Sequence, residues 1–177
     1  MNGTRGRARA AGLAAVVALL VPMGVGTPAA VASDGSAPAR VLGVAPDWQE
    51  RMLVRVNILR ARAGVAPVRL CPALASSAAA HARDMASSGE FSHTGSAGEE
   101  FWERMASVGY RMRTGGENIA AGQRAPWEVM KQWRESPGHM AIITNPDVRH
   151  AGFAVAVASA GPYRTYWVQD FAAGGRC

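Results

Sequence analysis

The segments F-S-H-T-G (91–95), G-G-E-N-I-A (115–120) and W-R-E-S-P-G-H (133–139) hold the polar groups on which the rest of this chain is organised. They supply two imidazoles, two carboxylates and an amide: His93, His139, Glu117, Glu135 and Asn118. Gly, Ser or Pro accompanies each segment, and these residues favour turns and the ends of helices and strands. Side chains at such ends can converge on one cavity, so we expect these five residues to form the working site.

The first 32 residues have the pattern of a secretory signal peptide. A basic start is followed by an apolar run and by a small-x-small cleavage site, A-V-A, at 30–32. An uncleaved membrane anchor is the alternative, but the strongly apolar part (13–25) contains Pro22 and is shorter than the roughly 20 residues of a spanning helix. We therefore predict an extracellular protein, secreted with no stable membrane anchor after cleavage.

The remainder of the chain has the size and charge of one globular domain. Residues 33–45 are small and contain Gly and Pro, which predicts a flexible linker before a domain at 46–177. Three arginines lie in the signal segment, so the 19 basic residues fall to 16, against 13 acidic ones, once it is removed. Because no cluster of cations interleaved with aromatics remains, we do not expect nucleic-acid binding. We expect the protein to be a monomer.

Two cysteines, Cys71 and Cys177, remain in this oxidising context. An even number favours a disulfide, and a bridge between them would close about 106 residues, worth roughly 4–5 kcal/mol as an upper value in the chain-entropy model. Two free thiols are the alternative. An unpaired cysteine at the C-terminus would be a liability outside the cell, so the sequence favours the bridge.

Helical periodicity dominates the first two thirds of the domain. We expect a helix with Asp47 as N-cap and Glu50 completing a capping box, and a second helix from Cys71-Pro72 to Gly89 with His81 as a hydrogen-bonded core residue. A short third helix spans 99–108. A fourth begins near Pro126, buries Trp127, Met130 and Trp133, and ends at Pro137-Gly138.

The last third changes to the alternating period of strands. Residues 152–159 and 163–172 predict a β-hairpin, and the segment around 117–120 is a candidate further strand. Helices followed by strands, without a βαβ repeat, predict an α+β fold with helices packed on a mainly antiparallel sheet.

The chemistry of the five residues leaves several roles open. His93 and His139 suit a Zn²⁺ ion, and Glu117 or Glu135 is a candidate general base for a metal-assisted hydrolase. The alternative is a buried polar network in which the acids orient the imidazoles. Glu135 and His139 are four residues apart, but Pro137 and Gly138 intervene, so this is not the helix of H-E-x-x-H metalloproteases. No G-x-S-x-G elbow marks a serine nucleophile.

In their order and spacing these motifs resemble those of the CAP superfamily: cysteine-rich secretory proteins, insect-venom antigen 5 and plant pathogenesis-related class-one proteins. The resemblance covers about residues 46–173 and is greatest to the compact bacterial single-domain branch. It comprises N-x-x-R (57–60), P-V-R-L-C-P-A-L (67–74), F-S-H-T, G-E-N-I-A, S-P-G-H, N-P (145–146) and W-V-Q-D-F (167–171).

The resemblance implies a three-layer α-β-α sandwich, an SCP domain, with a cavity lined by His93, Glu117, Glu135 and His139. It also implies a divalent metal, usually zinc, between the two histidines in some relatives, and sterol or fatty-acid binding or a role as a secreted protein ligand in others. No general reaction defines the family, so a binding or interaction module is the expected function. A hydrolase acting on a peptide, ester or glycan and a lipid-binding protein are the alternatives. With only two cysteines, this chain differs from the cysteine-rich eukaryotic branch.

Overall fold

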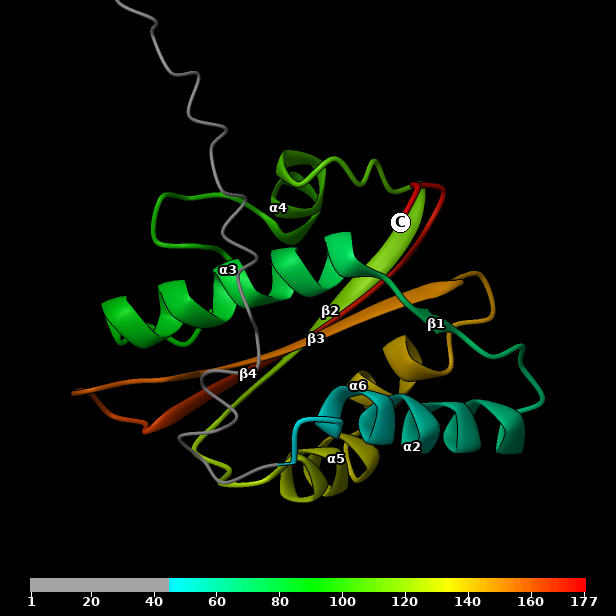
Figure 1. Cartoon of the computed structure of the whole chain (residues 1–177), viewed down its shortest axis with the longest axis horizontal. Helices are drawn as coiled ribbons and strands as arrows, with labels where there is room; N and C mark the ends of the chain where they lie inside the picture. Colours follow the sequence, from blue (N-terminus) through cyan, green and yellow to red (C-terminus); the bar gives the residue numbers. More distant parts are fainter. Residues whose placement is uncertain (1–44) are drawn as a thin grey trace, which may run out of the picture. The chain divides into compact units, whose positions relative to one another are not determined.

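The computed structural model describes residues 45–177, so the predicted signal peptide and all but the last residue of the predicted linker lie outside this part of the chain. The described residues form three layers with a sheet in the middle (Figure 1). One face carries α3 (Pro72–Ser88) and α4 (Phe101–Ser107), and the other carries α2 (Trp48–Arg62), α5 (Pro126–Arg134) and α6 (Pro137–Ile143). The predicted α+β sandwich is confirmed.

The central sheet has four strands in the order β1-β3-β4-β2. They are β1 (Arg69–Leu70), β2 (Thr114–Ala121), β3 (His150–Val157) and β4 (Thr165–Ala173). The predicted hairpin is the antiparallel β3–β4 pair, β2 pairs antiparallel with β4, and the short β1 pairs parallel with β3. The sheet is therefore mainly antiparallel, as predicted, and β2 is one of its edge strands.

Alternation along the strands divides the core between the two helical layers. Phe153, Val155, Trp167 and Phe171 pack with α2, α5 and α6, whereas the small residues of β3 and Val168 of β4 pack against α3. Gly152 permits the close approach of α3, because a Cβ there would overlap the backbone of Leu74 and Ala75. Consecutive residues of a strand thus face different layers.

Two polar side chains of α2 hold the link before β1 and the end of α6 with the loop that follows it. The amide of Asn57 bonds both backbone groups of Val68, accepting from its N–H at 2.9 Å and donating to its carbonyl at 3.0 Å. The guanidinium of Arg60, fully buried, donates to the carbonyls of Ala66, Ile143, Asn145 and Val148. The N-x-x-R motif therefore fixes the loop that follows α6 as well as the link before β1.

The predicted disulfide between Cys71 and Cys177 is confirmed, with Cα atoms 5.1 Å apart. It joins the N-cap of α3 to the last residue of the chain. The segment after β4 is thereby held against the same end of the sheet as β1.

Three local predictions were wrong. The carboxylate of Asp47 makes no capping bond and pairs instead with Arg51 at 2.8 Å, so the predicted capping box is absent from α2. Trp127 is 58 % exposed, whereas Met130 and Trp133 are buried as predicted. Pro137 begins α6 instead of ending the preceding helix, because proline is well tolerated in the first turn, where its missing N–H is not needed.

Replacing Arg60 by Met should lower the free energy of unfolding by about 3 kcal/mol, because it leaves several buried carbonyls without a donor. Urea denaturation followed by tryptophan fluorescence measures this change. Arg55→Met, an exposed substitution on the same helix, is the matched control and should stay within about 0.5 kcal/mol of the wild type. Equal stability of the two variants would contradict the clamping role of Arg60.

Candidate functional site

A buried carboxylate, Glu117 of β2, lies at the centre of the candidate site. Its side chain is 1 % exposed, and each of its oxygens has a partner. Oε1 lies 2.8 Å from Nδ1 of His93, and Oε2 accepts a hydrogen bond of 2.8 Å from Nη2 of Arg104. A buried charge is tolerated only when it is paired and hydrogen-bonded, and Glu117 meets both conditions.

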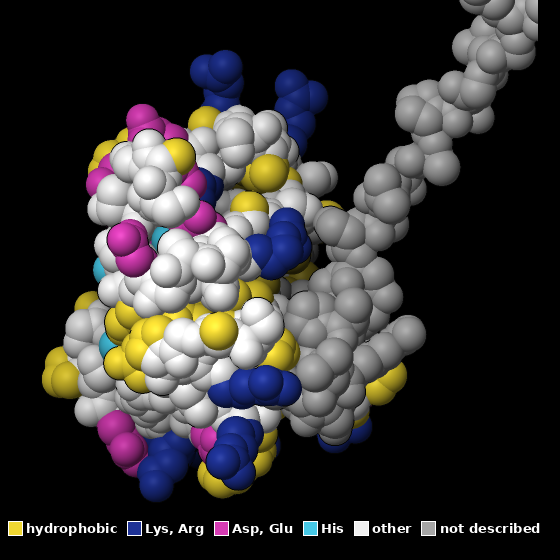
Figure 2. Space-filling view, turned by 90° about the vertical axis from the view of Figure 1, so that its left-hand side faces the viewer, with side chains coloured by type: hydrophobic (Ala, Val, Ile, Leu, Met, Phe, Trp, Pro, Cys, Tyr) yellow, Lys and Arg dark blue, Asp and Glu magenta, His cyan; other side chains and the backbone are white. Residues whose placement is uncertain are grey.

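The bond to Glu117 sets the orientation of the His93 imidazole. A carboxylate paired with arginine is an acceptor, so Nδ1 of His93 carries the hydrogen and Nε2 of the neutral ring keeps its lone pair. The His93 side chain is 53 % exposed, and its Nδ1 edge is the one turned toward the buried acid. Nε2 is consequently the nitrogen available to a ligand from solvent. Figure 2 shows histidine side chains at the surface along the left-hand margin of the face that it displays.

Arg104 comes from α4 and holds the His93 loop as well as the acid. It donates from Nη1 to the carbonyl of Glu99 and from Nη2 to the carbonyl of His93, at 2.8 and 2.9 Å. The helix that carries it begins with a capping box in which Glu100 and Glu103 each accept from backbone N–H groups. A short, well-capped helix therefore delivers a buried cation to the site.

A second carboxyl group, Asp170 of β4, lies directly across the strand pair from Glu117. Within residues 45–177 no hydrogen bond of standard geometry reaches either of its oxygens, although the Ser77 hydroxyl and the Glu117 carboxylate both lie close to it. Burial raises the pKa of Asp170 well above its usual range, and the negative charge of Glu117 adds to this shift. The neutral acid is favoured at Asp170, whereas Glu117 is the carboxylate of this pair that is bonded to the Arg104 guanidinium.

His81 completes the buried cluster from α3. Its Nε2 donates to the carbonyl of Ser92 at 2.9 Å and lies 3.7 Å from Glu117 Oε1. Burial lowers the pKa of His81, which favours the neutral ring. The sequence-based prediction of a hydrogen-bonded core histidine is confirmed, and the bond to Ser92 anchors the residue next to His93.

The other half of the site lies on the opposite face of the sheet. Asn118 follows Glu117 and points toward α5 and α6, where its amide donates to the His139 carbonyl at 3.3 Å and to Gln169 Oε1 at 3.1 Å. His139 lies in the first turn of α6 with its ring 6.3 Å from that of Trp133. Burial lowers the pKa of His139, and the proximity of His93 lowers it further. His93 and His139 thus flank the edge strand β2 from the two helical layers.

Glu135 is the predicted site residue that stands apart. It is the C-cap of α5, and its side chain is 57 % exposed. Among the described residues its carboxylate makes no hydrogen bond to either histidine, and its nearest cationic partner is Arg134 at 3.8 Å. The structure therefore joins His93, Glu117, Asn118 and His139, and leaves Glu135 on the surface beside them.

Sequence reasoning did not identify Arg104, Asp170 or Ser77 as parts of this cluster. For Asp170 a signal existed, because it is the acid of W-V-Q-D-F, in a strand otherwise suited to burial. Arg104 gave no such signal, since it lies in a helix with several charged neighbours. Nothing in the spacing of Ser77 distinguishes it from the other small residues of α3.

Comparison with known proteins now identifies the family. The sequence model of the Cysteine-rich secretory protein family (CAP) matches residues 53–171. The chain therefore belongs to the CAP family, and the resemblance carried by its motifs is confirmed.

Similar proteins come from several bacteria. "Uncharacterized protein YkwD" of Bacillus subtilis is 33 % identical over 136 residues, which are 77 % of this chain and 49 % of that protein. "Uncharacterized membrane protein YlbC" of the same species is 26 % identical over 123 residues, covering 70 % of this chain and 34 % of that protein. The chain thus spans half or less of the length of these curated relatives.

Solved structures share the fold. An extracellular protein of Bacillus anthracis containing an SCP domain has a TM-score of 0.61 at 24 % identity, covering 71 % of this chain and 40 % of that one. An outer surface protein of Borrelia burgdorferi has a TM-score of 0.62 at 16 % identity, covering 72 % of this chain and 94 % of that one. Across residues 45–177, no helix is both long and apolar enough to cross a membrane.

Replacing Asp170 by Asn should change how stability depends on pH. An unfolded Asp ionises near pH 3.9, whereas the pKa of Asp170 is raised in the folded protein. The contribution of Asp170 to the free energy of unfolding is therefore fully present below about pH 4 and is lost as the pH rises through the folded pKa. The Asn variant cannot ionise at this position, so it does not lose this stability as the pH rises. Its stability relative to the wild type should therefore rise, by up to about 1.4 kcal/mol per pH unit, above pH 4.

Urea unfolding of both proteins between about pH 4 and pH 8 gives the two profiles. Glu90→Gln, at an exposed position that makes no ion pair among the described residues, is the control and should run parallel to the wild type. Parallel profiles for Asp170→Asn as well would contradict a buried protonated acid at this position.

Proposed function

We propose that this CAP protein is an exported binding module whose His93 and His139 side chains hold a divalent cation or a small polar ligand. The observation that carries the proposal is the bond between Glu117 and Nδ1 of His93, which leaves Nε2 free to coordinate. Metal-binding histidines commonly donate their second ring N–H to a carboxylate in this way. The nearby His139 has a lowered pKa, which keeps a second imidazole in its coordinating form.

The donor set fits a weakly held ion better than a structural one. Two imidazoles that are half-buried or exposed suit Zn²⁺ as ligands. Structural zinc sites, however, use four protein ligands and catalytic sites use three. Within residues 45–177, no group of three or more His, Cys, Asp or Glu side chains is arranged to hold a metal ion. We therefore infer that His93 and His139 alone would hold the ion, which would exchange readily with solvent.

Binding is better supported than hydrolysis. A general base needs a free lone pair within reach of the water or hydroxyl that it deprotonates. Both oxygens of Glu117 are occupied, by His93 and by Arg104, and the side chain is buried. Glu135 is exposed, and among the described residues it makes no ion pair within 4 Å with either histidine. Glu117 is accordingly assigned an orienting role.

Export is part of the same proposal. The disulfide between Cys71 and Cys177 suits an oxidising compartment, and the B. anthracis relative is described as extracellular. The signal pattern of residues 1–32 agrees with secretion.

A groove between α2 and α5 favours a second candidate function, the capture of a fatty acid. Two adjoining pockets of about 210 and 230 Å³ share Arg55, and their apolar lining residues include Trp48, Met52, Leu59 and Met130. Cationic side chains border them: Arg51, Arg55, Arg62, Lys131 and Arg134. An apolar chain with one carboxylate would match this combination, and the groove does not involve the histidine site.

Zinc titration by calorimetry tests the first proposal. The mature protein should bind one Zn²⁺ in the micromolar range, and His93→Ala or His139→Ala should abolish this binding. Glu117→Gln should weaken it by about 10- to 100-fold, because the orienting carboxylate is lost. His150→Ala is the matched control, since His150 lies on β3 against Tyr110. If the wild type shows no saturable Zn²⁺ binding below about 100 µM, the metal proposal fails and the cluster acts as a structural polar network.

A fluorescent fatty-acid assay in the presence of chelator tests the second candidate. Trp127→Ala should weaken binding about tenfold, because the exposed indole borders the groove. Trp102→Ala removes another exposed tryptophan, 47 % against 58 % for Trp127, from α4 and should leave the affinity unchanged. An absence of fatty-acid binding by the wild type would exclude this function.

A further inference from the structure

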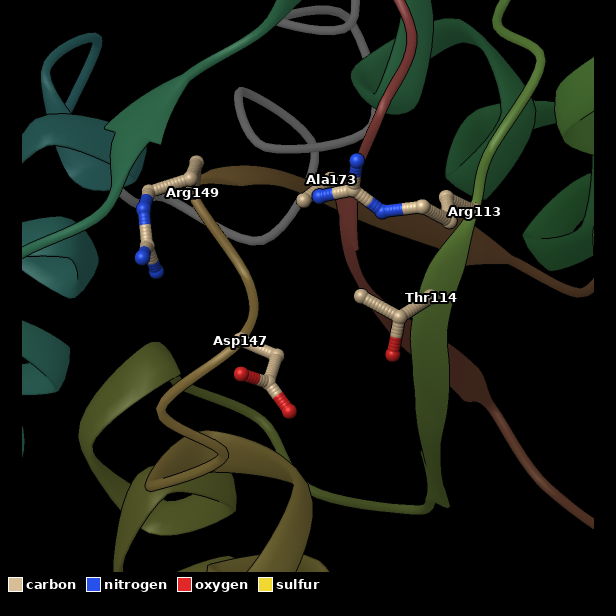
Figure 3. A pocket seen from close by; sticks show the side chains of 5 residues that line it. All are labelled: Arg113, Thr114, Asp147, Arg149 and Ala173. Carbon is tan, nitrogen blue, oxygen red and sulfur yellow. The ribbon is translucent and has the colours of Figure 1, made fainter.

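A pocket of about 250 Å³ lies at one end of the sheet, apart from the histidine site and from the α2–α5 groove. Its lining residues are Arg113, Thr114, Asp147, Arg149 and Ala173 (Figure 3). The volume corresponds to about eight water molecules, which suits a small molecule or one residue of a larger one.

Strand register explains why the surface is hollow here. Thr114 of β2 pairs with Ala173 of β4, and His150 of β3 pairs with Ala172. The regular pairing of β3 with β4 ends at His150, and the backbone N–H of the preceding residue, Arg149, donates to the carbonyl of Ala172. The short side chain of Ala173 lines the pocket together with the longer side chains of Thr114 and Arg149.

Arg149 is held in place before any ligand arrives. Its backbone N–H donates to Ala172 and its carbonyl accepts from Arg69, so the residue is fixed on both sides. Its Nη1 donates to the carbonyls of Pro146 and Val148 at 2.6 and 2.8 Å. These bonds occupy one nitrogen and leave Nε and Nη2, the edge that binds carboxylates in bidentate fashion.

Two further elements bring opposite charges to the same pocket. Arg113 is tied through its backbone N–H to the carbonyl of Ala173, and Figure 3 shows its guanidinium extending toward Ala173. Asp147 lies in the loop after α6, with its N–H bonded to Asn145 Oδ1 at 2.9 Å. Its carboxylate points to the opposite side of the pocket from the Arg113 guanidinium (Figure 3). Arg60 of α2 fixes this loop by donating hydrogen bonds to the carbonyls of Asn145 and Val148.

The charges of the pocket do not neutralise each other. Although both arginines and the aspartate line it, no ion pair within 4 Å joins Asp147 to Arg113 or Arg149 among residues 45–177. Figure 3 shows the Arg113 guanidinium, the Arg149 guanidinium and the Asp147 carboxylate at three separate positions around the pocket. Separate cationic and anionic groups match a ligand that is itself dipolar. A simple anion would meet the repulsion of Asp147, and a simple cation would meet that of the arginines.

We propose that this pocket binds the α-ammonium and α-carboxylate groups of an amino-acid zwitterion. Arg149 and Arg113 receive the carboxylate, the Thr114 hydroxyl donates a further hydrogen bond to it, and Asp147 accepts from the ammonium. The site is separate from His93 and His139, so its ligand requires no metal.

Titration of the ¹⁵N-labelled mature protein with L-alanine, followed by amide chemical shifts, tests the proposal. Saturable shifts should be confined to the pocket, with a dissociation constant of about 1 mM or below. N-acetyl-L-alanine, which lacks the ammonium, and L-alaninamide, which lacks the carboxylate, should each bind about tenfold more weakly or worse. Arg149→Gln, Arg113→Gln and Asp147→Asn should each weaken L-alanine binding to a similar extent.

Arg164→Gln provides a matched control, because Arg164 is an exposed arginine of the β3–β4 turn, remote from the pocket. Its affinity for L-alanine should equal that of the wild type, and the amide spectra of all variants report whether they are folded. Absence of saturable shifts up to about 50 mM L-alanine would overturn the proposal. Equal binding of N-acetyl-L-alanine or inorganic phosphate would overturn it too, by showing a site for simple anions.

Discussion

The buried carboxylate of Glu117 is the constraint on which the arrangement of this protein's candidate site depends. An ionised acid in the interior must be paired and fully hydrogen-bonded, and the partners here come from different parts of the chain. His93 comes from the loop after α3 and Arg104 from α4, each 2.8 Å from one carboxylate oxygen. Placing the charge therefore requires β2, the loop and α4 to dock together. The neighbouring Asp170 favours its neutral form, so a single negative charge is balanced by a single buried cation.

The second constraint is the position of β2 at the edge of the sheet. Successive residues of a strand face opposite sides, so Glu117 points into the layer of α3 and α4 while Asn118 points into the layer of α5 and α6. At a central strand, these two sides would be separated by the sheet. At an edge, groups anchored in the two layers can flank the same strand, as His93 does through Glu117 and His139 does through Asn118. The adjacent E-N pair of β2 thus connects both helical layers to one site.

Much of this arrangement could be predicted from the sequence, and the exceptions have physical causes. The hairpin, the α3 stripe and the disulfide follow from alternation, from helical spacing and from an even cysteine count. The motifs pointed to His93, Glu117, Asn118 and His139, and the structure places all four on or beside β2, whereas Glu135 lies on the surface. Arg104 and Asp170 escaped prediction because their partnership with Glu117 arises only from tertiary packing. Asp47 and Trp127 were misjudged for a similar reason: an i,i+4 ion pair with Arg51 replaced the cap, and the first turn of α5 lies too near the surface to bury its indole.

The tautomer of His93 tests the central claim most directly, because it reports the bond to Glu117 without any substitution or ligand. Long-range ¹H–¹⁵N correlation of the imidazole rings at about pH 8.5, where histidines are ordinarily neutral, distinguishes a protonated Nδ1 from a protonated Nε2. A His93→Gln variant assigns the signal. His93 should carry its hydrogen on Nδ1 and have an unprotonated Nε2. A ring protonated on Nε2, or one that exchanges freely between both forms as in an unstructured peptide, would contradict it.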